Sequence, residues 1–329
     1  MRKGTHPLKS GNNLLHEHGI HRVIVPVYLP NSDGYYKFGF EILSLCIKTL
    51  LLTVDSKTNI TIVLNETTHK VKRYLYELLE TKKIDQLIIN RFNHGKLDSI
   101  LSVARGCFED FITFVDCDAF FYPGWESSIA DVFNNFHEAG WVSSQPAPDT
   151  TWLNSCSTIF LAFSKGCLRK FPVMTDKNLD RFGESLGRPE MYKKRINEFY
   201  LAVERNNAKA IVGGNHFAFT IRRAVLEQIP IIPANKFIAE EMYFGQYFDR
   251  TDFWRLSTPE LLIQHMGNVS EEWMYKDLEE IIEGFSEEKP NWPTKESKVR
   301  QSIFPFIFRK YFCKVFRKYN FIKYLSRSN

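Results

Sequence analysis

Short apolar runs and helix-like stretches alternate between residues 22 and 115, and this alternation constrains the fold more than any other feature of the sequence. Each apolar run is rich in Val, Ile or Phe and has the length of a buried strand; the runs lie at 22–28, 59–64, 86–90 and 111–115. Between them, apolar residues recur at helical spacing, which predicts helices over 38–52, 69–82 and 97–106. The pattern predicts βαβ units, and therefore an α/β fold whose parallel sheet is covered by helices on both faces.

The regular alternation ends near residue 125, and the remainder of the chain mixes shorter elements. We expect strands at 156–163, 217–221 and 261–265, and helical stretches at 189–206 and 235–248. No internal repeat or low-complexity linker divides this part, so residues 22–290 are expected to form one continuous domain. A polar arm of residues 1–21 precedes the domain, and a tail of residues 291–329 follows it.

The cysteines and the N-terminal residues favour a soluble protein of the cytoplasm. The six cysteines are scattered and form no C-x-x-C pair, which favours a reducing compartment. No signal peptide is visible in the polar N-terminal residues, and the most apolar stretch, 38–54, is too short and too mixed to span a bilayer. His16, His18 and His21 offer a metal site in the arm, as an alternative to a loose polar segment.

Two acidic residues, Asp116 and Asp118, follow the fourth apolar run directly. Parallel α/β sheets bind their ligands at the carboxyl ends of the strands, so residues in this position are the first candidates for functional residues. A bend can turn both carboxylates toward one point, where hard oxygen ligands suit Mg²⁺ or Mn²⁺. The alternative is a polar loop with solvated acids, but the place of the pair after a buried strand favours a metal site.

The third apolar run is followed by Asn93-His94-Gly95-Lys96, at the start of the next expected helix. Gly95 permits close approach of the backbone to a ligand, and Lys96 adds a cation where a phosphate group would lie at a helix N-terminus. An ordinary turn followed by a helix start would look the same. The segment is therefore a candidate phosphate-binding loop.

Two later features are candidates for catalysis and metal binding. Glu240 and Glu241 lie in an otherwise apolar stretch, where burial or the like charge beside it can raise the pKa of a carboxylate enough to make it a general base. The alternative is a helix N-terminus, which accommodates acids for electrostatic reasons. His265 ends the last expected strand and is either a structural residue or a further metal ligand.

The order of these features resembles a GT-A fold glycosyltransferase of the family 2 type. The resemblance covers roughly residues 22–270 and rests on the Val-Ile-Val-Pro-Val-Tyr run, the Asn-x-Gly-Lys step, the D-x-D pair with Pro-Gly-Trp after it, the paired glutamates and a late His-x-Gly-Asn. It implies a GT-A (Rossmann-like), mostly parallel central sheet with a nucleotide-binding half over 22–125 and an acceptor-binding half over 126–290. The implied reaction is inverting transfer of a sugar from a nucleotide-sugar donor, for which the resemblance implies a UDP-sugar. The implied metal cofactor is Mn²⁺ or Mg²⁺. The implied acceptor is a hydroxyl of a glycan or lipid-linked molecule, in the synthesis of a bacterial cell-surface polysaccharide.

The resemblance also implies roles for individual residues. Asp116 would face the ribose and diphosphate of the donor, and the implied metal ligands are Asp116, Asp118 and His265. The implied donor pocket consists of Pro26, Val27, Tyr28, Asn65, Asn93, Lys96 and Asp116. Glu241 or Glu240 would be the catalytic base, and the acceptor would contact Trp125, Gly214, Asn215 and His216. The sequence departs from the family pattern in two places. The second strand ends in Asn65-Glu66, where the family commonly has an acidic pair. The candidate base is Glu, where the family usually has Asp.

Two other functions fit the same architecture. A nucleotidyltransferase would share the sheet and the metal, but it would carry a Gly-rich G-x-G-T-R loop after the first strand, and the sequence has none there. A non-catalytic carbohydrate-binding or scaffold protein would share the fold, since fold does not fix function. The set of candidate metal ligands and a candidate base favours an enzyme.

The positive charge of the chain is concentrated in its last part. The whole sequence has 43 basic and 38 acidic residues, a net charge of +5, yet residues 297–329 contain nine basic residues and no acid. Without these nine, 34 basic against 38 acidic residues leave the remainder at −4. Nine aromatic residues are interleaved with the basic ones, which predicts a helix on an anionic membrane surface, at the inner face of the cell membrane. The alternative is a helix that packs on the body or on a second copy of the chain. Nucleic-acid binding is not favoured, because the remainder of the chain is acidic.

Overall fold

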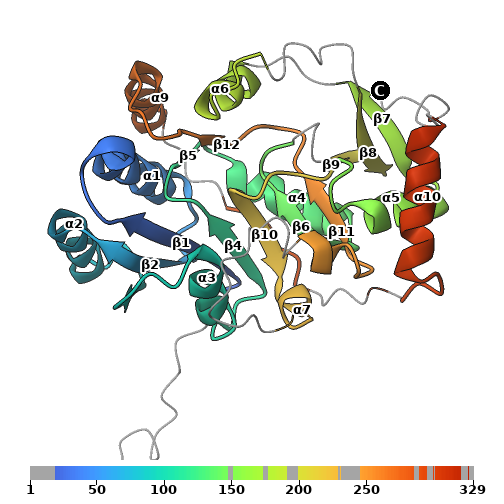
Figure 1. Cartoon of the computed structure of the whole chain (residues 1–329), viewed down its shortest axis with the longest axis horizontal. Coiled ribbons are helices and arrows are strands. Elements are labelled where there is room, and N and C mark those ends of the chain that lie inside the picture. Colours follow the sequence, from blue (N-terminus) through green and yellow to red (C-terminus); the bar gives the residue numbers. More distant parts are fainter. Residues whose placement is uncertain are drawn as a thin grey trace, which may run out of the picture.

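A ten-stranded mixed sheet forms the centre of the molecule in the computed structural model (Figure 1). The structure describes residues 19–146, 151–172, 177–190, 199–228, 230, 245–284, 289–294, 299, 301–319 and 325. The strand order is β3-β2-β1-β4-β10-β6-β11-β9-β8-β7. Seven of these strands run in one direction, and β10, β9 and β7 run against them.

The four strands and three helices predicted before residue 115 are confirmed. The strands are β1 (His21–Leu29), β2 (Asn59–Thr67), β3 (Gln86–Asn90) and β4 (Phe111–Val115). The helices between them are α1 (Gly39–Thr53), α2 (His69–Glu80) and α3 (Lys96–Ala104), with a short 3₁₀ turn, η2 (Gly34–Tyr36), before α1. Because β3, β2, β1 and β4 pair in parallel, their carboxyl ends lie along the same edge of the sheet.

The second part of the sheet is built differently. Strand β10 (Ala218–Arg222) runs antiparallel between β4 and β6 (Ala139–Ser143), and β11 (Trp254–Ser257) lies parallel to β6. An antiparallel group of β9 (Ala208–Val212), β8 (Phe199–Arg205) and β7 (Leu168–Pro172) completes the sheet. A separate two-stranded sheet of β5 (Ala119–Phe121) and β12 (Ile263–His265) follows β4. The strands expected at 217–221 and 261–265 therefore exist, as β10 and β12.

Two secondary-structure predictions in this part are wrong. Residues 156–163 form a helix, α5 (Cys156–Ser164), where a strand was expected. Most of its side chains are buried, so its apolar run shows no helical period, and a short buried helix reads like a buried strand. Conversely, the end of the predicted helix at 189–206 is strand β8. Of the helix expected at 235–248, residues 235–244 lie outside the described residues, and 245–248 are helical.

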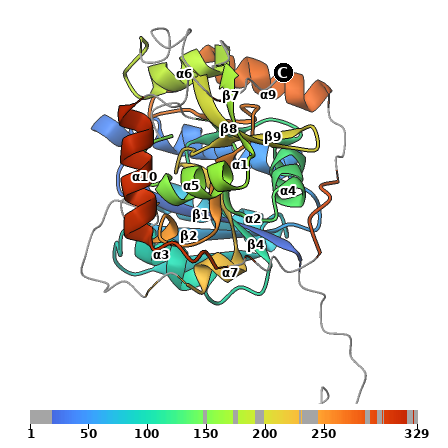
Figure 2. The same cartoon turned by 90° about the vertical axis from the view of Figure 1, so that its right-hand side faces the viewer.

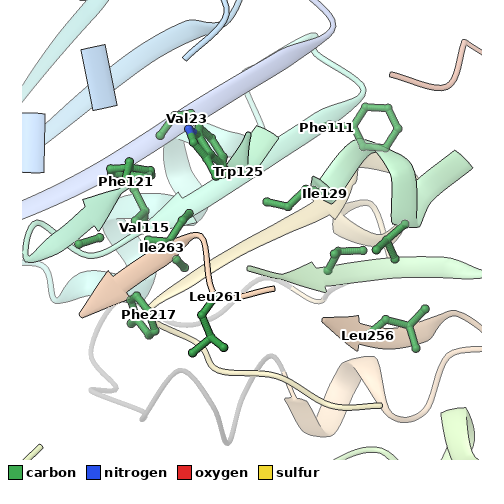
Figure 3. Packing of buried hydrophobic residues seen from close by; sticks show 14 of the residues in the cluster. Val23, Phe111, Val115, Phe121, Trp125, Ile129, Phe217, Leu256, Leu261 and Ile263 are labelled. Atoms are coloured by element: carbon green, nitrogen blue, oxygen red, sulfur yellow. The ribbon is translucent and has the colours of Figure 1, made fainter. Parts of the chain in front are cut away.

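A large apolar core fills the space between the sheet and α4 (Trp125–Asn135), and Figure 3 shows part of it. Trp125 lies in this core beside Phe121, fully buried, and its indole Nε1 donates a hydrogen bond to Thr53 Oγ1 at 3.2 Å. The prediction that Trp125 contacts an acceptor is therefore wrong. The turn at Gly124 begins α4 with this side chain directed into the core, where its large apolar surface is removed from water.

His21 begins strand β1 and so does not belong to a loose arm. It is fully buried, its Nδ1 lies 2.6 Å from Glu126 Oε1, and its Nε2 lies 2.6 Å from Thr113 Oγ1. Both ring nitrogens therefore have protein partners, which leaves neither for a metal ion. The other histidines of the suggested metal site, His16 and His18, lie outside the described residues.

The basic, aromatic end of the chain contains helix α10 (Phe306–Lys318), which packs against α5 (Figures 1 and 2). The ring of Phe160 on α5 lies 5.2–5.6 Å from the rings of three tail residues, Phe304, Phe308 and Phe312. Arg309 is 4% exposed, and its Nη2 is 2.5 Å from Asp252 Oδ1. One face of the helix is thus part of the body, as the packing alternative expected.

The remaining helices are α6 (Lys177–Ser185), α7 (Arg223–Leu226) and α9 (Glu272–Glu283). In Figure 1, α6 and α9 lie above the two-stranded sheet, on the side of the carboxyl edge of β1 and β4. Within the described ranges, no helix combines the length and the apolar character that a membrane crossing requires.

Candidate functional site

A cavity of about 370 Å³ opens at the carboxyl edge of the parallel strands. Its walls come from the ends of β1 and β2, the loop between β3 and α3, and the turn between β4 and β5. All the residues predicted for the donor pocket line it, together with one of the two further metal ligands: Pro26, Val27, Tyr28, Asn65, Asn93, Lys96, Asp116 and Asp118. Residues spread over more than ninety positions meet here because parallel strands place their carboxyl ends side by side.

The turn that carries the two acids is fixed by backbone hydrogen bonds on both sides. Asp116 N donates to Phe217 O at 2.7 Å, and Ala119 N closes the turn onto Asp116 O at 3.2 Å. After the turn, Asp118 O accepts from Met266 N at 2.8 Å. Strand β5 pairs with β12, with Ala119 opposite His265, so the pairing brings the histidine next to the second acid.

The hydrogen bonds of His265 fix which of its nitrogens faces the acid. Ser185 Oγ donates to Phe182 O at 2.8 Å, so its only hydrogen is used and it accepts a bond from His265 Nδ1–H at 3.0 Å. His265 Nε2 then lies 3.4 Å from Asp118 Oδ2. This distance is too long for a good hydrogen bond, but two ligand atoms of one small divalent ion, each about 2.1 Å from it, can be this far apart.

Asp118 is the residue of the cavity with the least satisfied side chain. Its Oδ1 is buried and has no hydrogen-bond partner in the structure. Burial raises the pKa of the Asp118 carboxyl; His265 opposes the shift and Asp116 adds to it. A buried acceptor without a partner is costly, and a bound cation would both pair with it and hold it ionised. The residues present therefore fit a hard divalent ion.

The ion would complete the group of ligands. Among the described residues, no three His, Cys, Asp or Glu side chains are already gathered as a metal-binding group. Asp118 and His265 are the close pair, and Asp116 is instead ion-paired with Lys96. Asp116 is therefore a ligand only if it leaves that lysine.

The loop before α3 offers an anion-binding end to the cavity. Gly95 precedes the helix with a φ of +79°, a conformation that favours glycine, and its N–H donates to Asn93 Oδ1 at 2.8 Å. The first helical residue is Lys96, so a lysine and a helix N-terminus both lie on the cavity wall. Each favours a negatively charged group such as a phosphate.

Asn65 lines the cavity, but its side chain makes its hydrogen bonds to neighbouring protein groups. It is 2% exposed, and its amide is hydrogen-bonded to Ser99 Oγ at 2.7 Å, to Gly95 O at 3.2 Å and to Asn90 Nδ2 at 2.8 Å. These bonds tie the end of β2 to the loop before α3. Asn65 therefore positions the loop, and its amide has little capacity left for a ligand.

Tyrosine rings form the outer wall of the cavity, and two of them were not predicted from the sequence. Tyr28 lies edge-on to Tyr36 at 5.9 Å between ring centroids, and Tyr35 lies edge-on to Tyr36 at 5.3 Å. Tyr35 is 69% exposed, so part of its ring is open to a ligand. The signal was present as a tyrosine pair in the loop after the first strand, but nothing in a loop sequence says which way its rings face. Gly267 and Asn268, also missed, complete the wall.

A second group of polar side chains lies at the ends of β6 and β11. Gly214 is packed so closely that a Cβ there would come within 2.6 Å of Ser143 Cβ, and Asn215 N–H donates to Gln145 O at 3.5 Å. The side-chain atoms Gln145 Nε2 and Oε1, Asn215 Nδ2 and Ser257 Oγ are buried and have no hydrogen-bond partner. Of the residues predicted to contact an acceptor, Gly214 and Asn215 belong to this group, with His216 next in the chain. Glu240 and Glu241 lie outside the described residues.

Comparisons with known proteins add only distant similarities. Neither the family models nor the curated proteins include a match to this sequence. Among solved structures, the mannosyltransferase PcManGT from Pyrobaculum calidifontis, in complex with GDP-Man and Mn²⁺, is 12% identical, with a TM-score of 0.46 over 82% of this chain and 63% of that one. S. aureus TarS 1–349 is 14% identical, with a TM-score of 0.40 over 72% of this chain and 57% of its own. The chain spans less than two thirds of either protein, and similarities of this size carry no argument about function.

Proposed function

We propose that this protein is a glycosyltransferase, which moves a sugar from a nucleotide-sugar donor to a hydroxyl group of an acceptor. The observation that carries the proposal is the composition of the cavity at the carboxyl edge of the sheet. Exposed tyrosine rings, a lysine at a helix N-terminus and an acid with one buried oxygen that lacks a hydrogen-bond partner occur within one cavity of about 370 Å³. Those three parts match the base, the diphosphate and the metal of a metal-bound nucleoside diphosphate.

Each wall of the cavity then has a role in holding the donor. Tyr28, Tyr35 and Tyr36 flank the base, since aromatic rings stack on bases irrespective of their sequence identity. Lys96 and the N-terminus of α3 bind the diphosphate, and Asp116 accepts from the ribose or binds the cation. Asp118 and His265 would hold the cation, Mn²⁺ or Mg²⁺, which when bound stabilises the negative charge of the leaving diphosphate.

The acceptor side of the proposal rests on the polar group at the ends of β6 and β11. Gln145, Asn215 and Ser257 have buried donors and acceptors without partners, and a ligand rich in hydroxyl groups would satisfy them. This group lies one strand away from the acids, since only β10 separates β4 from β6. A glycan or a lipid-linked sugar is the class of acceptor that this chemistry fits.

We assign the catalytic base to Glu241, with Glu240 as the alternative. The base removes the proton of the acceptor hydroxyl while its oxygen bonds to the anomeric carbon and the bond to the diphosphate breaks, so the anomeric configuration inverts. Positioning of donor and acceptor supplies much of the remaining acceleration. Glu241→Gln should keep donor binding in calorimetry and lose transfer; if transfer is retained, the base is Glu240 or another group.

A panel of nucleotide sugars tests the proposal. The purified full chain is incubated with each donor and Mn²⁺, and released nucleoside diphosphate is measured. A glycosyltransferase hydrolyses one donor slowly without an acceptor, and NMR of the product sugar reports whether the anomeric configuration has inverted. Pyrophosphate formed from a sugar phosphate and a nucleoside triphosphate would mean a nucleotidyltransferase, and no turnover or binding of any donor would contradict the proposal.

A further inference from the structure

Helix α10 has two faces of different character. Its inward face contributes Arg309, Cys313 and Phe316, all buried against the body. On the outward face, Ile307, Tyr311, Lys314 and Lys318 follow one another at spacings of four, three and four residues, which puts them on one side of a helix. All four are exposed. The packing on α5 therefore explains only half of the helix.

The outward face is apolar in its first half. Ile307 is 81% exposed and Tyr311 is 66% exposed; Ile303, one turn before the helix, is 90% exposed. Single exposed apolar residues are ordinary, but Ile307 and Tyr311 lie one turn apart on the helix; with Ile303, four residues earlier in the chain, they make up an exposed apolar strip. Apolar side chains that stay in water add little to the stability of the fold. The strip therefore indicates a partner that covers these side chains and removes them from water.

The second half of the same face is basic. Beside the helix is a hollow of about 790 Å³, whose other wall includes Trp152. Four cations line it: Lys310, Lys314, Arg317 and Lys318. None of the described residues that line it is acidic. The Arg317 guanidinium lies over the Trp152 ring, 5.5 Å from its centroid, so at least one of the cations is held in place at the mouth of the hollow.

We propose that the outward face of α10 docks on an anionic lipid membrane. Ile303, Ile307 and Tyr311 enter the boundary between headgroups and acyl chains, and the lysines and Arg317 contact lipid phosphates. A nucleic acid offers phosphates but no apolar phase for two isoleucines. A second copy of the chain, docked about a twofold axis, would set the four cations against the same four if the two helices were parallel, and against the apolar half of the face if they were antiparallel. A lipid surface satisfies both halves of the face.

Vesicle flotation with the full chain tests the docking. Vesicles of phosphatidylcholine alone are compared with vesicles that also contain phosphatidylglycerol. We expect the chain to float with the anionic vesicles and to remain behind with the neutral ones. Added salt should release it, because the attraction between exposed charges is screened. Equal binding to neutral and anionic vesicles, or no binding to either, would overturn the proposal.

Two pairs of variants separate the halves of the face. Lys314→Glu with Lys318→Glu should weaken vesicle binding about 30-fold or more, because each basic residue near an anionic surface contributes roughly fivefold. Ile303→Ser with Ile307→Ser should weaken it about tenfold through the apolar surface lost. The matched controls are Lys82→Glu with Lys83→Glu at the end of α2, and Ile282→Ser on α9, which is 56% exposed. α2 and α10 lie at opposite ends of the molecule in Figure 1, so the charge control should bind as the parent does.

Two readouts keep this proposal separate from the proposed function. The variants replace exposed side chains, so their thermal midpoints and their donor hydrolysis in solution should equal those of the parent; parent-like binding by both variant pairs overturns the proposal. If the parent instead dimerises in light scattering, and the variants abolish the dimer while vesicles bind neither, the face is an interface between copies. Absence of donor hydrolysis in the parent would contradict the glycosyltransferase assignment and leave the vesicle result standing.

Discussion

The cavity at the carboxyl edge of the sheet and the α10 face are both lined by charged and aromatic side chains, yet they are assembled in opposite ways. The cavity collects residues from six segments of the chain, and its acids, Asp116 and Asp118, line it. The α10 face comes mostly from one helix, and its cations are turned outward. A carboxylate oxygen that is buried without a hydrogen-bond partner indicates a cation at short range, whereas exposed charges of one sign indicate an extended partner. The net charge of +5 is the sum of nine positive charges in residues 297–329 and −4 in the remainder of the chain.

The largest effect is expected in the cavity, from Asp118→Asn. The variant removes the negative charge that would hold the cation. Donor turnover should fall about 1,000-fold, which is the size of effect seen when an enzyme loses a preorganised group that stabilises charge in the transition state. Turnover is measured as released nucleoside diphosphate at saturating Mn²⁺. The fold should be unaffected, since Asn fills the same space. Asp33→Asn, at an exposed acid in the loop after β1, is the control, and normal turnover by Asp118→Asn would refute the metal assignment.

The inward face of α10 is expected to matter for stability instead of activity. Arg309→Ala leaves Asp252 without its partner in a partly buried position, and breaking such a pair costs about 3–5 kcal/mol of unfolding free energy. Denaturant unfolding of the full chain measures it. Lys310→Ala, at the exposed neighbour, should change the free energy by less than about 0.5 kcal/mol. Equal effects of the two substitutions would contradict the distinction between the faces.

A smaller effect is expected from the residue that orients His265. Ser185→Ala removes the acceptor of the Nδ1–H bond and should weaken Mn²⁺ binding about tenfold, which is typical for the loss of a hydrogen bond to a metal-binding histidine. Calorimetric titration with Mn²⁺ in the absence of donor measures this directly. Ser185→Thr keeps the hydroxyl and should restore the affinity. An unchanged affinity in the alanine variant would mean that Ser185 does not position a metal ligand.

The smallest effect concerns a charge that belongs to neither region. Burial opposes ionisation of Glu138, but hydrogen bonds from Arg205 and Lys165 outweigh it and lower its pKa to about 2. A lowered pKa stabilises the fold above the unfolded value of 4.5, and this contribution is lost as the pH falls from there toward 2. Glu138→Gln should cost about 1 kcal/mol at pH 7, a value reduced by solvent screening, and should remove this part of the acid sensitivity. Glu80→Gln, on the exposed side of α2, is the control for thermal unfolding across the same pH range.

The fold of residues 22–125 could be predicted closely because its signals are local. A buried parallel strand needs a short apolar run, and an amphipathic helix needs apolar residues at helical spacing, so β1 to β4 and α1 to α3 can be read from the chain. Knowing that the strands are parallel was enough to predict that the residues after them meet at one edge. The rule made the residues after each strand candidates, and the resemblance to the glycosyltransferase family grouped Tyr28, Lys96 and Asp116 in one predicted donor pocket.

The second half was less predictable because its signals are not local. The apolar run of α5 is buried nearly all round and so has no visible period, and β8 carries charged residues that look helical. The orientation of single side chains was equally hidden. Trp125 follows a strand and Asn65 lies near the end of one, as functional residues do, yet the first fills the core and the second ties the end of β2 to the loop before α3.

The sequence by itself determined the class of the fold, the position of the acids at the end of β4, and the concentration of positive charge in the last part of the chain. Only the tertiary structure decided that Asp118 lies beside His265, that Tyr35 and Tyr36 wall the cavity, and that α10 buries one face and exposes the other. The reason is physical: propensity and periodicity act over a few residues and are written in the order of the chain. Contacts between distant segments depend on how the packed elements share space, and that is settled only when the whole chain has folded.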